Sequence, residues 1–121
     1  MITGILHVTF LTDDLPRARA FYEGILGLKP DPARPAMSFD GVWYDVALNQ
    51  QIHLMVLPAV DAGLPRPVHG GRDRHVALRV SDIERLKMRL DEAGVAYTMS
   101  RSGRDALFCR DPDQNALEFI E

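Results

Sequence analysis

The sequence predicts an α+β fold of two βαβββ modules in tandem, with curved mixed sheets forming a cleft and helices outside. The chain begins twice in the same way, because His7-Val8 followed by Asp14 recurs 68 positions later as His75-Val76 followed by Asp82. Each half then has the pattern of a strand, a helix and three short strands. The length of 121 residues is typical of one domain. We expect this domain to comprise module 1 (residues 1–57), a linker (58–73) and module 2 (74–121).

The first half opens with an alternating, β-rich strand pattern and continues with an apolar stripe at helical spacing. Asp14 is the expected N-terminal cap of this helix, and Gly27 is its expected stop. The Asp40-Gly41 pair is typical of a two-residue hairpin, and Asn49-Gln50 is expected to form the next turn. The expected strands of this half are Ile5–Leu11, Ala36–Phe39, Val42–Leu48 and Gln51–Leu57.

The second half repeats this order. Ser81-Asp82-Ile83-Glu84 fits a capping box in which Ser81 caps the helix, and Gly94 fits the position just after its end. Asp111-Pro112-Asp113-Gln114 predicts a tight turn. The expected strands are Arg74–Val80, Val95–Met99, Asp105–Cys109 and Asn115–Glu121. The proline- and glycine-rich stretch from Pro58 to Arg72 is typical of a linker.

Composition excludes several classes of protein. The net charge of −3 lacks the basic footprint of a nucleic-acid-binding protein. No apolar run reaches the length of a membrane span, and the first residues lack a secretory signal pattern. Cys109 is the single cysteine, so no internal disulfide or cysteine-pair zinc site is possible, and we expect it to be a small buried hydrophobe. These features favour a cytoplasmic protein.

Four strands share an unusual feature that points to a metal site. Their side-chain alternation gives each one an apolar face, and places His7, His53, His75 or Glu118 on the opposite face. If the sheets curve around that face, three imidazoles and a carboxylate converge, which is costly unless a divalent cation satisfies them. Any one of these residues alone is more typical of ordinary core or surface. Their repeat-equivalent positions favour the metal hypothesis.

Other residues on these strands are candidates for the substrate pocket. We expect the pocket lining to include Thr9, Trp43, Tyr44, Met55 and Arg79. Trp43 and Tyr44 fit either the cleft wall or the core, and Arg79 fits either an anionic substrate group or a carboxylate partner. His69 lies in the linker and is expected to be exposed to solvent.

The full chain resembles the vicinal oxygen chelate superfamily of glyoxalase I, fosfomycin- and bleomycin-resistance proteins and extradiol dioxygenases. The resemblance rests on His7-Val8, His75-Val76-Ala77 and above all the closing Asp111-Pro112-Asp113 … Asn115-Ala116-Leu117-Glu118. It implies two βαβββ modules, a homodimer and His7, His75 and Glu118 as metal ligands. His53 stands where glyoxalase-like members usually have Glu or Gln, so it is a ligand, a base or neither. Gln114 replaces the usual glycine of the turn.

The resemblance implies a glyoxalase-type lyase or isomerase that binds a small molecule with vicinal oxygens at a divalent metal such as Zn, Ni, Mn, Fe or Co. Glu118 or His53 would be the general base. The alternatives are a bleomycin-resistance-type binding protein without turnover, an Fe(II) ring-cleaving dioxygenase and a fosfomycin-type thiol transferase. Nucleic acids and membranes are not expected partners.

Overall fold

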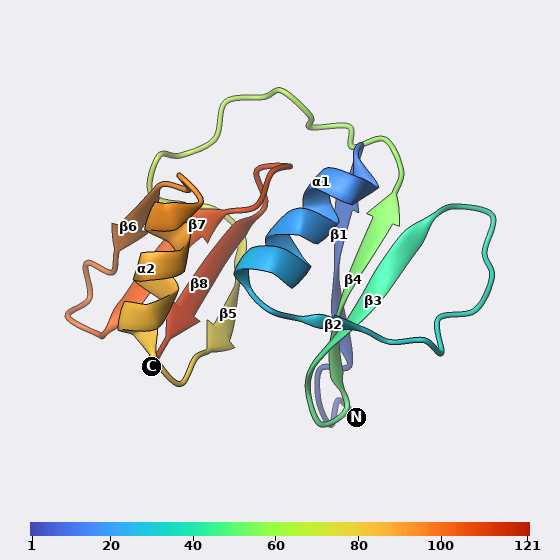
Figure 1. Cartoon of the computed structure of the whole chain (residues 1–121), viewed down its shortest axis with the longest axis horizontal. Coiled ribbons are helices and arrows are strands. Elements are labelled where there is room, and N and C mark those ends of the chain that lie inside the picture. The colour runs from blue at the N-terminus through green and yellow to red at the C-terminus, as the bar shows by residue number, and fades with distance from the viewer. The chain divides into compact units, whose positions relative to one another are not determined.

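The computed structural model describes all residues from 1 to 121. The chain forms two compact units, Met1–Ala62 and Gly63–Glu121, and each unit contains one four-stranded mixed sheet (Figure 1). No helix combines the length and apolar character that crossing a bilayer requires.

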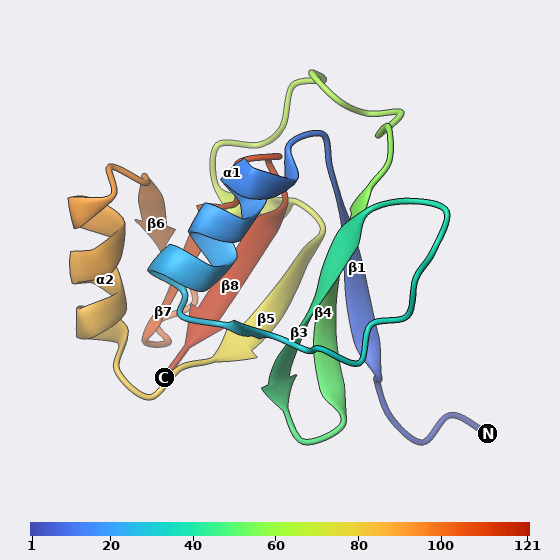
Figure 2. The same cartoon turned by 45° about the vertical axis from the view of Figure 1, so that its right-hand side comes forward.

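The first unit has the order strand, helix, three strands. Its sheet has the strand order β1-β4-β3-β2, with β1 parallel to β4 and the other pairs antiparallel. Residues 1–6 precede the first strand and contain no helix or strand (Figure 2). The elements are β1 (His7–Thr12), α1 (Leu15–Arg19), its π-helical continuation η1 (Ala20–Ile25), β2 (Lys29–Pro30), β3 (Gly41–Ala47) and β4 (Gln50–Val56).

The second unit has the same order after a short 3₁₀ turn. Its sheet has the order β5-β8-β7-β6, with β5 parallel to β8 and the other pairs antiparallel. The elements are η2 (Gly70–Arg72), β5 (His75–Arg79), α2 (Ile83–Glu92), β6 (Tyr97–Met99), β7 (Ala106–Arg110) and β8 (Ala116–Ile120). The predicted α+β fold of two βαβββ modules is therefore confirmed.

Strand register relates the two modules residue by residue. Thr9 pairs with His53 between β1 and β4, and Ala77 pairs with Glu118 between β5 and β8. His7 and His75 each lie two residues before the first member of these pairs. Positions two apart lie on the same face of a strand. Each module therefore brings its two candidate residues onto one face of neighbouring strands.

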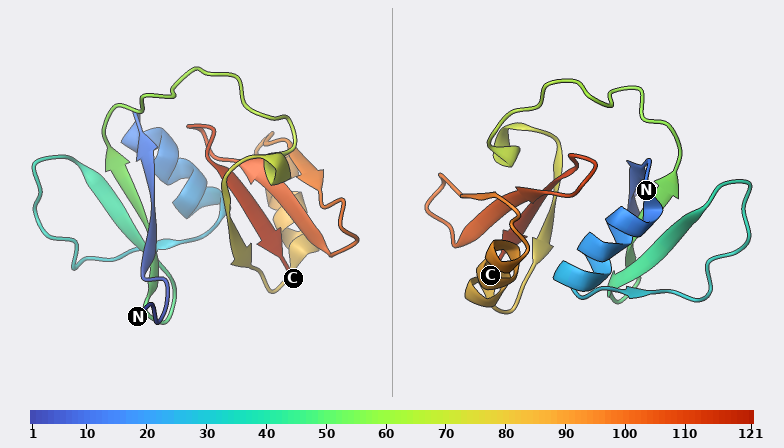
Figure 3. Two further views of the ribbon diagram at one scale, coloured as in Figure 1. Left: turned by 180° about the vertical axis from the view of Figure 1, so that it is seen from behind. Right: turned by 45° about the horizontal axis from the view of Figure 1, so that its top comes forward.

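The opposite face of each sheet packs against the helix. In the first unit, Tyr22 of η1 stacks on Tyr44 of β3 with ring centroids 5.8 Å apart, and both side chains are fully buried. In the second unit, the buried residues of α2 recur at helical spacing and are Ile83, Leu86 and Leu90. Seen from behind, η2 lies in front of the second sheet and α2 lies behind it (Figure 3, left). The helices thus cover the apolar faces and leave the faces with the histidines to other contacts.

The predicted strand at Ala36–Phe39 is wrong, because residues 31–40 form a loop and the second strand is Lys29–Pro30. The Asp40-Gly41 hairpin is also wrong. Gly41 begins β3 and pairs with Met55, where an added Cβ would overlap the carbonyl oxygen of Leu54. This glycine therefore allows β3 to lie close to the backbone of β4 and does not form a turn.

The caps of the two helices are both aspartates. Asp14 accepts a hydrogen bond from the amide of Arg17, as predicted, and Gly94 follows the end of α2 with φ 68°. Ser81 is not the cap of α2, because the carboxylate of Asp82 accepts the bond from the amide of Arg85. The capping-box prediction was one residue too early. Either residue type can cap a helix, so composition alone did not distinguish them.

Candidate metal centre

His75 and Glu118 form a close pair on the second sheet. His75 Nε2 lies 3.2 Å from Glu118 Oε2, and the Glu118 side chain is only 4% exposed. The other carboxylate oxygen, Oε1, is 3.2 Å from Nη2 of Arg104, which lies in the loop before β7. Phe108 borders the pair, with its ring edge-on to His75 at a centroid distance of 5.2 Å. A histidine and a carboxylate thus meet on a sheet face with one aromatic wall.

The tautomer of His75 follows from its second nitrogen. Nδ1 lies 2.9 Å from the backbone carbonyl oxygen of Asp73, and a carbonyl only accepts hydrogen bonds, so Nδ1 carries the hydrogen. In the neutral ring, Nε2 then directs its lone pair towards the Glu118 carboxylate. Two acceptors face each other at 3.2 Å unless a cation, either a proton or a metal ion, lies between them. Imidazole and carboxylate suit first-row divalent metals, and a backbone carbonyl on the other ring nitrogen is a common support for a ligating histidine.

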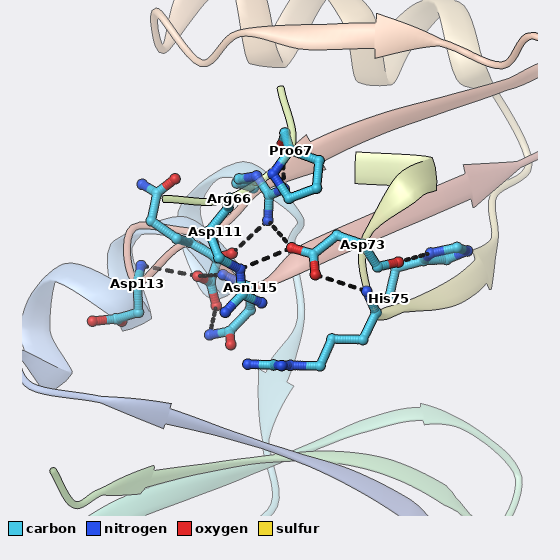
Figure 4. A network of polar contacts seen from close by, with 10 residues as sticks. Arg66, Pro67, Asp73, His75, Asp111, Asp113 and Asn115 are labelled. Carbon is cyan, nitrogen blue, oxygen red and sulfur yellow. Dashed lines mark hydrogen bonds and ion pairs between the residues drawn. The ribbon is translucent and has the colours of Figure 1, made fainter. Parts of the chain in front are cut away.

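Asp73 is itself fixed by a partly buried ion network (Figure 4). Its Oδ2 accepts hydrogen bonds from Arg66 at 2.9 Å and Arg110 at 2.8 Å, and Oδ1 accepts one from the amide of Arg74 at 2.8 Å. Burial by itself would raise the pKa of Asp73. The hydrogen bonds from the two arginines and the amide outweigh it, so the pKa lies below its usual value. The charged side chain of Asp73 is therefore fixed by its hydrogen bonds, and its carbonyl group contacts His75.

The equivalent face of the first sheet carries a stack of three rings. His53 lies between His7, at a centroid distance of 4.0 Å and an angle of 11°, and Trp43, at 4.3 Å and 5°. Trp43 is the partner of His53 across β3 and β4, as Phe108 is of Glu118 across β7 and β8. The first module thus places aromatic rings where the second places an acid and a phenyl ring.

A chain of hydrogen bonds determines the tautomer of His53. The side-chain nitrogen of Gln51 donates to Asp31 and to Asp45, each at 2.8 Å, so its Oε1 is the atom facing His53 Nε2 at 2.8 Å. Nε2 of His53 therefore carries the hydrogen and Nδ1 carries the lone pair. Burial, followed by the nearby charges of His7 and Arg34, lowers the pKa of His53. The neutral ring with a basic Nδ1 is favoured.

A groove of about 870 Å³ opens over these rings. Thr9 and Met55 lie on the same sheet face as His53, one as its strand partner and the other two residues further on. Tyr44 lies on the opposite face, in the core under η1, because adjacent strand residues alternate. Arg79 lies exposed at the end of β5, on the same face as His75. The groove lining comprises Leu6, His7, Trp43, Asp45, Ala47, Leu48, Asn49, Gln51 and His53.

His69 is only 9% exposed, so the expectation that it faces solvent is wrong. Its Nδ1 is 2.6 Å from the hydroxyl oxygen of Thr98, and its ring packs edge-on against Phe108. The linker composition correctly indicated irregular backbone. It could not indicate that this backbone lies against the sheet.

Neither unit gathers three or more histidine, cysteine or acidic side chains in an arrangement that could hold a metal ion. His75 and Glu118 supply two donors, and His7 lies in the other unit. A metal held by this pair needs at least one further protein ligand or a substrate atom to complete a usual coordination shell.

Sequence reasoning missed three residues of these sites: Gln51, Asp73 and Arg104. Gln51 shared a predicted face with His53, so its side chain was open to inference. Asp73 acts through its backbone carbonyl, which any residue possesses. Arg104 lies in the loop between β6 and β7, where no periodic pattern indicates which way its side chain points. Only the first of these had a signal in the sequence.

The fold and these sites define a class of small proteins with two βαβββ modules, in which the polar candidate residues lie on the sheet faces opposite the helices. The chain belongs to the Glyoxalase/Bleomycin resistance protein/Dioxygenase superfamily, whose family model matches residues 4–119. No protein of curated function matches the sequence.

Three solved structures illustrate the similarity. A glyoxalase family protein from Bacillus anthracis is 26% identical, with a TM-score of 0.74 and coverage of 98% of this chain and 94% of that one. A Glu-to-Gln variant of the fosfomycin resistance protein FosX from Listeria monocytogenes, complexed with Mn(II) and 1S,2S-dihydroxypropylphosphonic acid, is 17% identical, with a TM-score of 0.76 and coverage of 99% and 92%. Lactoylglutathione lyase from Agrobacterium tumefaciens is 24% identical, with a TM-score of 0.66 and coverage of 98% and 92%.

Proposed function

We propose that this protein is a metal-dependent enzyme of glyoxalase type, a lyase or isomerase, in which His7, His75 and Glu118 hold one divalent cation. The observation that carries the proposal is the pair formed by His75 Nε2 and Glu118 Oε2, 3.2 Å apart, with Nδ1 engaged by the Asp73 carbonyl. Two imidazoles and one carboxylate leave coordination positions open for substrate. His7 comes from the same chain or from a second copy in a homodimer, as the family resemblance implies.

The ring stack supports a role for His53 beside the metal rather than on it. A ligating imidazole has the metal in its own ring plane, along the nitrogen lone pair. His7 and His53 are nearly parallel, at 11°, with centroids 4.0 Å apart, so the lone pairs of the two stacked rings would not both be directed at one ion. We therefore assign His7 as the ligand and His53 Nδ1 as the general base. The Gln51 amide fixes the tautomer that leaves this nitrogen basic.

The proposed substrate is a small molecule with two adjacent oxygens. A bound divalent cation would act as a Lewis acid that stabilises negative charge on the substrate oxygens. His53 would accept a proton from the substrate carbon next to these oxygens. Arg104 would orient Glu118 through its contact with Oε1, the carboxylate oxygen that does not face His75. The complex of FosX with Mn(II) and a dihydroxypropylphosphonic acid supports this substrate class, because that ligand carries adjacent hydroxyl groups.

Metal titration tests the proposal directly. Mn(II) binding, followed by electron paramagnetic resonance, should be weakened at least about 100-fold by His7→Ala and by Glu118→Gln, because even outer-sphere partners are worth 10–100-fold. Glu92→Gln, an exposed carboxylate at the end of α2, is the matched control and should bind like the wild type. Equal affinity in all four proteins would refute the ligand assignment.

Substrate assays then separate the reaction classes. Loss of the hemithioacetal absorbance with methylglyoxal and glutathione would support the glyoxalase-type reaction. Oxygen uptake with catechols in the Fe(II) protein would instead identify a ring-cleaving dioxygenase. Binding of a small molecule without turnover, in a protein that also binds no metal, would favour the bleomycin-resistance type.

A further inference from the structure

We propose that Arg110 is a positioning residue for the metal ligand His75, acting through Asp73. This inference rests on the proposed function, since it concerns how that site is held. The hydrogen bonds of the Arg110 side chain go to Asp73, Gln114 and Pro67, and none goes to His75 or Glu118. Its effect passes through the Asp73 carboxylate to the Asp73 carbonyl, which accepts the hydrogen of His75 Nδ1.

Arg110 bonds to three separate parts of the chain. Its Nη1 donates to Asp73 Oδ2 and to the Gln114 carbonyl, both at 2.8 Å, and its Nη2 donates to the Pro67 carbonyl at 2.6 Å. The guanidinium side chain is 15% exposed and that of Asp73 is 11% exposed. One planar group thus joins Pro67 of the linker, Asp73 two residues before His75, and the turn between β7 and β8. A planar fork of donors suits this geometry, whereas the single ammonium of a lysine does not.

The linker segment before Asp73 is also packed onto the sheet. Gly70 lies so close to β7 and β8 that an added Cβ would be 3.4 Å from Cβ of Phe108 and 3.3 Å from Cβ of Ala116. The amide of Asp73 donates to the Gly70 carbonyl at 3.1 Å. Every polar atom of Asp73, in backbone and side chain, is therefore hydrogen-bonded. Its carbonyl has a fixed direction because its neighbours hold it from both sides.

This fixed carbonyl determines which nitrogen of His75 is available. With Nδ1–H held by Asp73, Nε2 is the atom that points at Glu118. If the carbonyl moved away, the ring could carry its hydrogen on either nitrogen and rotate about its side-chain bonds. A metal would then bind a ring that must first be oriented, and affinity would fall by the amount typical of lost outer-sphere support, about 10–100-fold.

The experiment uses two readouts on the full chain. Long-range ¹H–¹⁵N spectra of the metal-free protein, recorded at alkaline pH so that the imidazole is neutral, report the tautomer of His75, and Mn(II) titration reports the metal affinity of the protein. Arg110→Gln should change His75 from a single Nδ1–H form to a mixture and should weaken Mn(II) binding about 10–100-fold. Arg110→Lys should restore these properties only in part. Arg85→Gln, on the exposed side of α2, is the matched control and should change neither.

A purely structural role would lower stability without changing either readout, so both are measured well below the unfolding temperature. Folded Arg110→Gln protein with an unchanged His75 tautomer, or with unchanged Mn(II) affinity, overturns the proposal. If Arg110→Gln does not fold, Arg66→Gln takes its place, because it removes the other arginine on Asp73 Oδ2. If the wild type binds no Mn(II), the proposed function fails, and the tautomer comparison alone decides whether Arg110 positions His75.

Discussion

Cys109, the only cysteine of the chain, is held in the core on the helix side of the second sheet. It is 3% exposed, and burial raises the pKa of its thiol to about 12. Because the thiolate is the reactive form, the native protein should not react with a disulfide reagent such as DTNB at pH 8. One thiol per chain should react rapidly once urea unfolds the protein. Fast stoichiometric reaction of the native protein would contradict this burial.

At the scale of single residues, the sequence predicted side chains well where a strand pattern determined their direction. His53 and Glu118 share sheet faces with His7 and His75 because alternation and register require it. The direction of a side chain could not be predicted where the backbone is irregular. His69 is such a case, because its burial depends on a linker that packs back onto Thr98 and Phe108.

The start of α2 offers a test at the scale of elements. Asp82, not Ser81, accepts the hydrogen bond from the amide of Arg85 at 2.8 Å. Asp82→Ala should therefore lower the free energy of unfolding by about 1 kcal/mol, the usual value of an N-cap, while Ser81→Ala should change it by less than about 0.5 kcal/mol. Urea unfolding of both variants measures the difference. A larger loss of unfolding free energy for Ser81→Ala than for Asp82→Ala would instead support Ser81 as the cap.

The elements themselves were predictable to different degrees. Segments with a clear apolar periodicity, such as α2 and β8, were predicted with the correct type and nearly correct bounds. The second strand of the first module was not predictable, since Lys29–Pro30 is two residues long and exists only through its pairing with Asp45 and Tyr44 of β3. The glycine after Asp40 resembled a turn signal but serves strand approach. Tertiary contacts, rather than local preference, decide such short elements.

At the scale of the whole molecule, two modules with one register carry different chemistry. The positions occupied by His7, His53 and Trp43 in the first sheet hold His75, Glu118 and Phe108 in the second. The first set is a stack of three rings in which the pKa of His53 is lowered. The second set is the pair of His75 and Glu118 beside the ring of Phe108, and Asp73 and its ion pairs hold His75 in place. In the proposed function, this duplicated scaffold supports a division of roles, with His53 as a neutral base in one module and Glu118 as an anionic ligand in the other.

The lowered pKa values of His53 and Asp73, one in each module, predict two separate losses of stability as the pH falls. The pKa of His53 is lowered from its ordinary value of 6.5 by burial and then by His7, and that of Asp73 is lowered from 3.8 because its hydrogen bonds outweigh burial. In both cases the unfolded state binds a proton at a higher pH than the folded state. The stability from each group is therefore complete above its unfolded pKa and is lost as the pH falls through the folded one.

Urea unfolding of the metal-free protein at pH 8, 5.5 and 3 measures these losses. The wild type should lose stability first below about pH 6.5 and again below about pH 4. The stability difference between the wild type and His53→Gln should narrow in the first interval, and that between the wild type and Asp73→Asn in the second. A constant difference for His53→Gln from pH 8 to 5.5 would mean that the ring takes up a proton equally in both states. The position of His53 between His7 and Trp43 would then not favour the neutral base that the proposed reaction requires.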